Sequence, residues 1–214
     1  MAVIHNTTMS PGKLELLEAW LPTQPWYTGP ARRPELVKAG GFRLDDPEGE
    51  VGIEFMVVAD LSGDRPVAYH VPLSYRGAPL DGAGQGLIGT SEHGVLGRRW
   101  IYDGTHDPVV VAQVLALLQG RAKAQHQSVT GAPDTSVTSH CSLDALPAED
   151  EPGNVHNDEH GTRVETATAT LEVVRTLGSP QGADTYDGHV TAAWHLPDGG
   201  EHRGPFFVLR TTAR

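Results

Sequence analysis

The spacing of hydrophobic residues changes along the chain, and each change predicts a different element. In the stretch 50–76 apolar and polar residues alternate, which is the period of a strand with one buried face. Two alternating runs, 51–57 and 67–75, flank Asp60-Leu-Ser-Gly-Asp64, whose residues favour a turn. The pattern therefore predicts an antiparallel hairpin. Pro72 has no backbone N–H to donate and indicates a sheet edge or a bulge.

Two other segments show the 3.6-residue period of a helix. The first follows Ser10-Pro11, where Ser can cap the free amides and Pro suits the first turn, and it ends at Pro22. The second follows Asp107-Pro108 and runs out near residues 121–123. Both helices are expected on one face of the sheet, which defines an α+β fold. The apolar stripes are Leu14, Leu17, Trp20 and Leu21, and then Val110, Val114, Leu117 and Leu118.

Composition divides the chain into three parts. Residues 1–125 are predicted to form an α+β domain. Residues 126–163 are rich in Ser, Thr, Pro, Asp, Glu and His, and such a segment buries too little apolar surface to offset its ordering entropy, so we expect a polar mobile linker or a long loop. Residues 164–214 are expected to form a small antiparallel β segment. Its three predicted strands are 170–176, 189–196 and 205–211.

Charge and composition exclude several classes of function. The chain has 16 basic and 27 acidic residues and a net charge of −11, which disfavours nucleic acid and anionic lipid because both need clustered Lys and Arg. No run approaches the ~20 apolar residues of a membrane span. Cys141 is the single cysteine, so we expect no disulfide and no thiolate zinc cluster. The first residues lack the pattern of a signal peptide, and we predict a cytoplasmic protein.

Two motifs suggest chemistry, and each has a simpler interpretation. Gly82-x-Gly84-x-Gly86 resembles a phosphate loop, but no Lys-Ser/Thr pair follows it, which favours a flexible loop. His156-Asn-Asp-Glu-His160 could hold zinc on a helix or begin a kinase catalytic loop. Position 163, where such a loop needs a magnesium ligand, is Arg, and the motif lies in the polar interval, which favours a solvated acidic run. We predict no catalytic residue, no metal and no cofactor.

The lysines argue against phosphoryl transfer. Lys13 and Lys123 fall in helical runs and Lys38 lies in the short stretch 34–40, so none is predicted on a strand. Kinase-type transfer usually depends on a strand lysine that reaches the nucleotide phosphates. An arginine can replace the charge of that lysine but not its geometry. The sequence favours a binding protein, although it does not decide the question of catalysis.

Aromatic residues beside arginines are the candidate binding residues. They occur in Pro25-Trp-Tyr27 and in the run 98–103, both at expected element ends. Such pairs are favoured at protein interfaces and at sugar-stacking surfaces, and they also occur as packing at the rim of a core. The predicted contact surface comprises Trp26, Tyr27, Arg98, Arg99, Trp100 and Tyr102.

Three segments resemble the N-terminal cap domain of actinobacterial maltokinases, namely 49–60 (GEVGIEFMVVAD), 69–80 (YHVPLSYRGAPL) and 87–103 (LIGTSEHGVLGRRWIYD). The resemblance implies a cystatin-like, curved antiparallel sheet packed by helices. In maltokinases this cap lies against the nucleotide-binding lobe of an enzyme that makes maltose 1-phosphate from maltose and ATP for α-glucan synthesis. The catalytic residues lie in later lobes, and the roughly 50 residues of 164–214 are too few for them, so the resemblance does not carry phosphotransfer over to this chain.

Three functions remain open. The preferred one is a non-catalytic cap-like module that binds or regulates through protein contacts, with a partner enzyme of α-glucan, trehalose or maltose metabolism or a second copy of itself. The alternatives are a maltokinase-like sugar kinase that uses ATP, and a small carbohydrate-binding module that uses the same aromatic residues.

Overall fold

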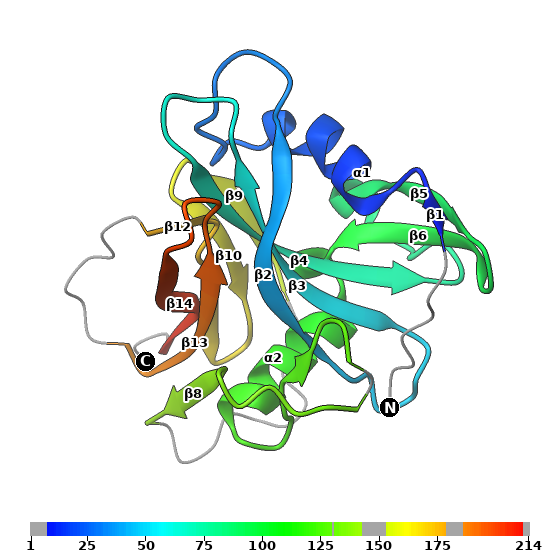
Figure 1. The fold of residues 1–214 in the computed structure, drawn as a ribbon. Coiled ribbons are helices and arrows are strands. Elements are labelled where there is room, and N and C mark those ends of the chain that lie inside the picture. The colour runs from blue at the N-terminus through cyan, green and yellow to red at the C-terminus, as the bar shows by residue number, and fades with distance from the viewer. Residues whose placement is uncertain (1–7, 130, 143–152, 179–185, 212–214) are drawn as a thin grey trace.

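The computed structural model describes residues 8–129, 131–142, 153–178 and 186–211 (Figure 1). These residues form mainly antiparallel strands with two α-helices and three short 3-10 turns. The helices are α1 (Lys13–Trp20) and α2 (Pro108–Leu118), and the turns are η1 (Leu21–Thr23), η2 (Gly84–Gly86) and η3 (Gly104–His106). The strands are β1 (Met9–Ser10), β2 (Leu36–Leu44), β3 (Gly52–Asp60), β4 (Val67–Arg76), β5 (Leu87–His93), β6 (Gly97–Asp103), β7 (Gln125–His126), β8 (Thr138–Cys141), β9 (Val155–Asp158), β10 (Gly161–Glu165), β11 (Ala169–Val173), β12 (Thr176–Leu177), β13 (Gly188–His195) and β14 (Glu201–Thr211).

All of these strands belong to one open sheet. Its order is β1-β5-β6-β4-β3-β2-β13-β14-β11-β10-β9, with β12 paired to β4, β7 to β2 and β8 to β13. The prediction of a fold dominated by antiparallel strands is confirmed. Neither helix in the described part of the chain has the length and apolar character that a membrane span requires.

The predicted hairpin at 51–75 is present as β3 and β4, paired from Gly52↔Tyr75 to Asp60↔Val67. Pro72 lies inside β4, which is an internal strand and not a sheet edge. On the side of β4 away from β3, β12 pairs with Tyr69 and Ala68, and β6 pairs only from Leu73 onward. Pro72 falls in the gap between these two partners, so its missing N–H costs no ladder hydrogen bond.

The two helices pack on opposite faces of the central strands (Figure 1). Phe55 and Val57 of β3 share a hydrophobic cluster with α2, whereas Met56 and Val58 share one with α1. The expectation that both helices cover one face is therefore wrong. Successive residues of a strand point to opposite faces, and since β3 is apolar at both sets of positions it must be covered on both sides.

The helix boundaries agree with the sequence at one helix and differ at the other. The Asp107 carboxylate caps α2 by accepting a hydrogen bond from the Val109 amide at 3.0 Å, as the cap-and-proline pattern predicts. In the first helix Ser10 is not the cap, because Met9–Ser10 forms strand β1 and Gly12 occupies the N-cap position of α1.

The interval 126–163 differs from the expected linker where the structure describes it. Strand β8 pairs with β13, and β9 forms a hairpin with β10. Backbone hydrogen bonding does not require apolar side chains, so polar strands can add to the border of a sheet without contributing to the core. The rest of the predicted linker includes residues 143–152, which lie outside the described residues.

The C-terminal strands join the sheet of the N-terminal part. Trp194 of β13 pairs with Gly40 of β2, and β12 pairs with β4. Phe206 and Phe207 are buried in the same cluster as Phe42 of β2, with ring centroids of Phe42 and Phe206 6.1 Å apart. The N-terminal and C-terminal parts therefore share one hydrophobic core.

Candidate functional site

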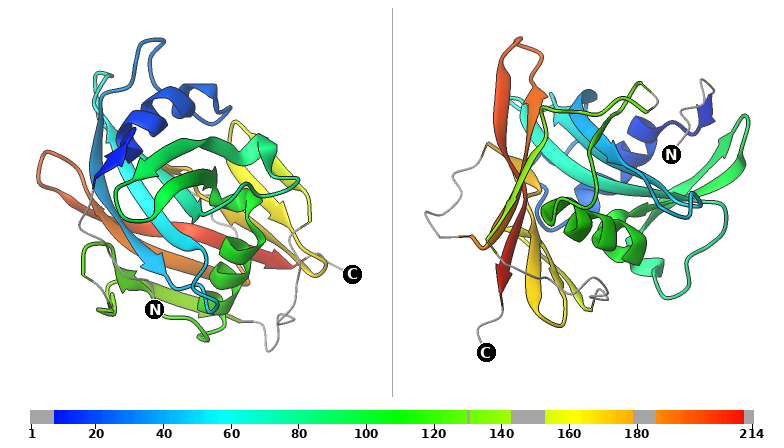
Figure 2. Two further views of the ribbon diagram at one scale, coloured as in Figure 1. Left: turned by 90° about the vertical axis from the view of Figure 1, so that its right-hand side faces the viewer. Right: turned by 90° about the horizontal axis from the view of Figure 1, so that it is seen from below.

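The hairpin of β5 and β6 extends away from the body of the molecule (Figures 1 and 2). Strand β6 pairs with β4 only from Trp100 to Asp103, so the distal part of the hairpin has no third strand on that side. The loop at its tip carries Val95 and Leu96, which are 62% and 44% exposed. Exposed apolar residues on a projecting element are a common feature of contact surfaces.

One face of this hairpin combines an aromatic ring with charged residues. Trp100 lies directly opposite Thr90 of β5 and Arg76 of β4. Arg98 lies opposite Glu92, and its Nε donates to Glu92 Oε1 at 2.8 Å. Residues directly opposite each other project on the same side of a sheet, so these residues form one surface. We call Arg76, Thr90, Glu92, Arg98 and Trp100 the hairpin face.

Arg76 is held rigidly at the inner end of the hairpin face. Its Nε and Nη2 donate to the two carboxylate oxygens of Asp107, both at 2.7 Å, and Asp107 is fully buried. The hydrogen bonds that Arg76 donates to Asp107 raise the pKa of the Arg76 guanidinium, against the opposing effect of its partial burial. A bidentate pair fixes the guanidinium plane as well as its position.

Arg99 points to the other side of β6. Its Nη2 donates to the Leu96 carbonyl at 2.6 Å, which braces the tip of the hairpin. Its guanidinium also lies against Gly77, where an added Cβ would come within 2.9 Å of Nη1. Arg99 therefore has a visible structural role within the hairpin, unlike the exposed Arg98.

Trp26 and Tyr102, both predicted as contact residues, are buried. Trp26 is 1% exposed and packs against Trp20 and Tyr69, with ring centroids 5.8 and 6.0 Å away. Tyr102 is 2% exposed, and its hydroxyl accepts a hydrogen bond from the Leu80 amide at 2.9 Å. These two residues are therefore corrected to core residues. An aromatic beside an arginine in sequence has the same pattern whether its ring points inward or outward.

Tyr27 lies apart from the hairpin face. Its ring packs 5.4 Å from that of Tyr69, and its hydroxyl donates to Asp60 Oδ2 at 2.7 Å. Tyr69 is seven residues before Arg76 along β4, which corresponds to roughly 23 Å of extended strand. Partial burial and Asp60 raise the pKa of Tyr27. Of the six predicted residues, the structure thus brings Arg98 and Trp100 together on the hairpin face, with Arg99 behind them.

The sequence motifs do not assemble into a site among the described residues. Gly82-x-Gly84-x-Gly86 leads through η2 into strand β5, not into a helix that could hold phosphate at its N-terminus. The run 156–160 forms β9 and its turn, so His156 and His160 are not on one face of a helix. Within the described ranges no three His, Cys, Asp or Glu side chains are grouped as a metal would require.

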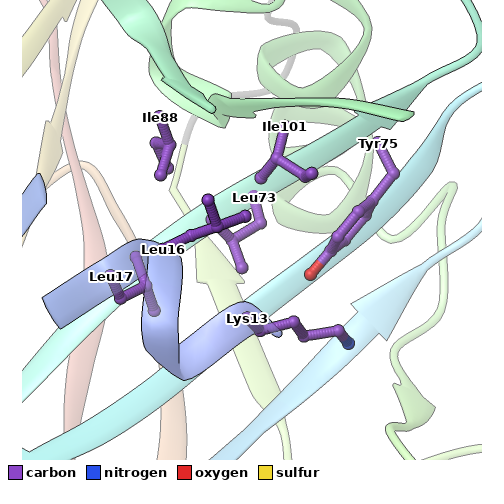
Figure 3. A pocket seen from close by; sticks show the side chains of 7 residues that line it. All are labelled: Lys13, Leu16, Leu17, Leu73, Tyr75, Ile88 and Ile101. Carbon is purple, nitrogen blue, oxygen red and sulfur yellow. The ribbon is translucent and has the colours of Figure 1, made fainter. Parts of the chain in front are cut away.

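The structure corrects the placement of Lys38, which lies on strand β2 and not in a short irregular stretch. Lys13 of α1 and Tyr75 of β4 border a small depression under the helix, shown in Figure 3. Its other walls are apolar side chains of α1 and of the sheet. The remaining lining residues are Leu16, Leu17, Leu73, Ile88 and Ile101.

Comparison with protein families gives one match. Residues 20–107, about two fifths of the chain, match the maltokinase N-terminal cap domain. This segment is similar to that family. The match supports the resemblance drawn from 49–60, 69–80 and 87–103, and it begins inside α1 and ends at Asp107, the cap residue of α2. The hairpin face lies within the cap segment, whereas α2 and strands β7–β14 lie outside it. A search among curated proteins gives no significant match.

Sequence reasoning missed five residues of the candidate surface, of which Thr90 and Glu92 join the hairpin face through the β5–β6 register. Val95 and Leu96 are exposed because they occupy the hairpin loop, and Arg76 joins the face through the β4–β6 register. The repeated glycines at 94 and 97 around an apolar pair are the signal that could have identified the tip.

Proposed function

We propose that this protein is a non-catalytic cap-like module that binds or regulates another protein, an enzyme of α-glucan, maltose or trehalose metabolism, through the hairpin face. The match of residues 20–107 to a cap domain of maltokinases supports the link to this metabolism. The proposal includes a cytoplasmic location and the curved, cystatin-like form of the helix-packed cap. The residues of the hairpin face provide the other support for the proposal.

The observation that carries the proposal is the position of Trp100 between Arg76 and Arg98 on a projecting hairpin. Trp and Arg are the residue types that most often dominate the binding energy of protein interfaces. Arg76 is already fixed by Asp107, so less side-chain entropy is lost when it contacts a partner. The apolar tip at Val95 and Leu96 extends the same surface.

The surface also defines the chemistry of its partner. Arg76 and Arg98 bring two guanidinium groups to this surface, and Asp107 and Glu92 each pair with one of them. A complementary surface would carry an apolar pocket for Trp100 surrounded by hydrogen-bond acceptors for the remaining guanidinium N–H groups.

A pull-down with matched variants tests the proposal. The purified protein is used as bait in lysate of its native cells, in wild-type form and as Arg98→Glu/Trp100→Ala. The control is Arg163→Glu, which reverses the charge of an exposed arginine on β10. Arg163 pairs with Asp158 of β9, and both strands are far from the hairpin in the strand order. We expect an enzyme of α-glucan, maltose or trehalose metabolism to be enriched by wild type and by the control, but not by the hairpin variant. Equal recovery with all three baits, or no such enzyme with any, contradicts the proposal.

Two assays separate the alternative functions. Incubation of the pure protein with maltose, ATP and magnesium tests the sugar kinase, and turnover that is lost on substitution of His156 or Asp158 would replace our proposal. Calorimetric titration with maltose, trehalose and longer glucans tests the carbohydrate-binding module. Saturable sugar binding that is lost in Trp100→Ala would favour that module, since a partly exposed tryptophan can stack on a sugar ring.

A further inference from the structure

A second group of polar residues lies toward one end of the central strands β2, β3 and β4, on the face that α1 covers. At its centre is Glu54 of β3, which is 4% exposed. The Glu54 Oε2 atom accepts hydrogen bonds from Lys13 Nζ at 2.5 Å and from the Tyr75 hydroxyl at 2.7 Å, and Oε1 accepts one from Gln127 Nε2 at 3.2 Å. Burial alone would raise the pKa of Glu54, but Lys13 and Tyr75 outweigh it and lower that pKa, so the carboxylate is charged.

Two further cations of β2 lie on the same face as this carboxylate, Arg43 opposite Glu54 itself and Lys38 opposite Val58. Arg43 of β2 lies directly opposite Glu54 in the β2–β3 register, so both side chains project on the same face. Lys38, on the same strand, interacts electrostatically with both Glu54 and Lys13. Within the described part of the chain, neither Arg43 nor Lys38 forms an ion pair of its own within 4.0 Å. Asp45, two residues beyond Arg43, accepts a hydrogen bond from the side chain of Gln125, which lies opposite Arg43.

The charges of this group do not balance. Lys13, Lys38 and Arg43 supply three positive charges against the carboxylates of Glu54 and the nearby Asp45, which leaves a surplus of one. Two of the three lysines of an acidic chain gather here. Burial and the nearby ammonium of Lys13 both lower the pKa of Lys38, whereas Glu54 opposes them. A structural role explains Lys13, because its pair with Glu54 ties α1 to β3, but it explains neither Lys38 nor Arg43.

We propose that Lys13, Lys38 and Arg43 form a binding site for a small phosphate dianion, either inorganic phosphate or a phosphate monoester. A phosphate carries enough negative charge to offset this surplus, and its oxygens can accept hydrogen bonds from all three cations. The guanidinium of Arg43 can donate two parallel hydrogen bonds to phosphate oxygens, and the ammonium groups act as point charges. Glu54 serves as a positioning residue that holds Lys13 in place and is not itself a ligand. This site is separate from the hairpin face and does not depend on the function proposed for it.

Titration with inorganic phosphate and with methyl phosphate, at constant ionic strength set by chloride, tests the site. Binding is followed by calorimetry and by chemical shifts of backbone amides. We expect saturable binding of both compounds by the wild-type protein. Each of Lys38→Met and Arg43→Met should weaken it by about tenfold, because each removes a charge-assisted hydrogen bond. Neither variant breaks an ion pair seen in the structure, so both should keep the wild-type circular dichroism spectrum.

The control is Lys123→Met, which removes an exposed lysine after α2 and lowers the net charge equally. It should bind phosphate as the wild type does, and so should the hairpin variant Arg98→Glu/Trp100→Ala. Absence of saturable binding overturns the proposal, as does an equal loss in Lys38→Met and Lys123→Met. Acetate that binds as tightly as phosphate would overturn the assignment of a dianion.

Discussion

Arg175 and Asp103 form a buried ion pair that connects the C-terminal part of the chain to the cap segment. Arg175 Nη2 donates to Asp103 Oδ2 at 2.5 Å, and the two side chains are 0% and 1% exposed. The guanidinium also donates to Thr162 Oγ1 at 2.7 Å and lies over the Trp26 ring, 4.9 Å from its centroid. Burial lowers the pKa of Arg175, and Asp103 opposes that effect. The buried guanidinium of Arg175 therefore contacts both Asp103 of β6 and Thr162 of β10, strands that lie near opposite ends of the strand order.

Removal of one partner of this pair should destabilise the protein strongly. Arg175→Met leaves the Asp103 carboxylate buried without its cation, and such a change typically costs about 3–5 kcal/mol of unfolding free energy. Urea unfolding followed by tryptophan fluorescence measures the loss. Arg98→Met, which breaks the exposed pair with Glu92, is the matched control and should cost at most about 1 kcal/mol. Similar losses of unfolding free energy in both variants would show that the buried pair contributes no more to stability than the exposed pair.

Separation of the N-terminal part from the C-terminal strands should prevent cooperative folding. A fragment of residues 1–125 lacks Phe206, Phe207 and Leu209, all buried against the central strands, and it lacks Arg175. Small domains have little stability in reserve, so loss of these core residues should not be tolerated. We expect the fragment to show no cooperative thermal transition by circular dichroism. A sharp transition with dispersed amide resonances would instead establish 1–125 as an independent domain.

Acid should destabilise the protein through His70. This residue is fully buried beside Phe206 and Phe207, and its Nδ1–H donates to the Val174 carbonyl at 3.2 Å. Burial, together with the charge of Arg175, lowers the pKa of His70 to about 3. In the unfolded chain the pKa of a histidine is about 6.5, so between these two values the unfolded state binds a proton that the folded state does not.

The stability that depends on neutral His70 is therefore complete above about pH 6.5 and decreases as the pH falls toward 3. At pH 5 the expected loss is about 2 kcal/mol. Urea unfolding at pH 7.5 and at pH 5 measures it, and His70→Phe should lose about 2 kcal/mol less than wild type over the same interval. His195→Gln, an exposed substitution, is the control. An identical pH dependence in wild type and His70→Phe would contradict the assignment.

Asp107 has two roles that substitution can separate. Its carboxylate caps α2 at the Val109 amide and binds the Arg76 guanidinium. Asp107→Asn keeps a capping oxygen but loses the charge, and Asp107→Ala loses both. A cap contributes about 1 kcal/mol, so by unfolding in urea Asp107→Ala should be less stable than Asp107→Asn by about that amount. Equal stabilities would mean that the capping hydrogen bond contributes nothing measurable.

The sequence by itself determined the local elements whose signals act over a few residues. The hairpin of β3 and β4 followed from alternation around a turn, and the start of α2 followed from Asp107-Pro108. The resemblance in 49–60, 69–80 and 87–103 was sufficient to identify the cap segment. In each of these cases the information lies in residues that are close along the chain.

Only the tertiary structure decided which faces are buried and which distant residues meet. Trp26 and Trp100 were both predicted as contact residues, yet Trp26 is in the core and Trp100 is on the hairpin face. Arg175 meets Asp103 across 72 positions of the chain. Lys38 was predicted to lie off any strand, yet it is part of β2, and the β2–β3 register places Arg43, five residues beyond it, opposite Glu54. Contacts of this kind depend on strand order and register, which non-local packing sets and a local pattern does not contain.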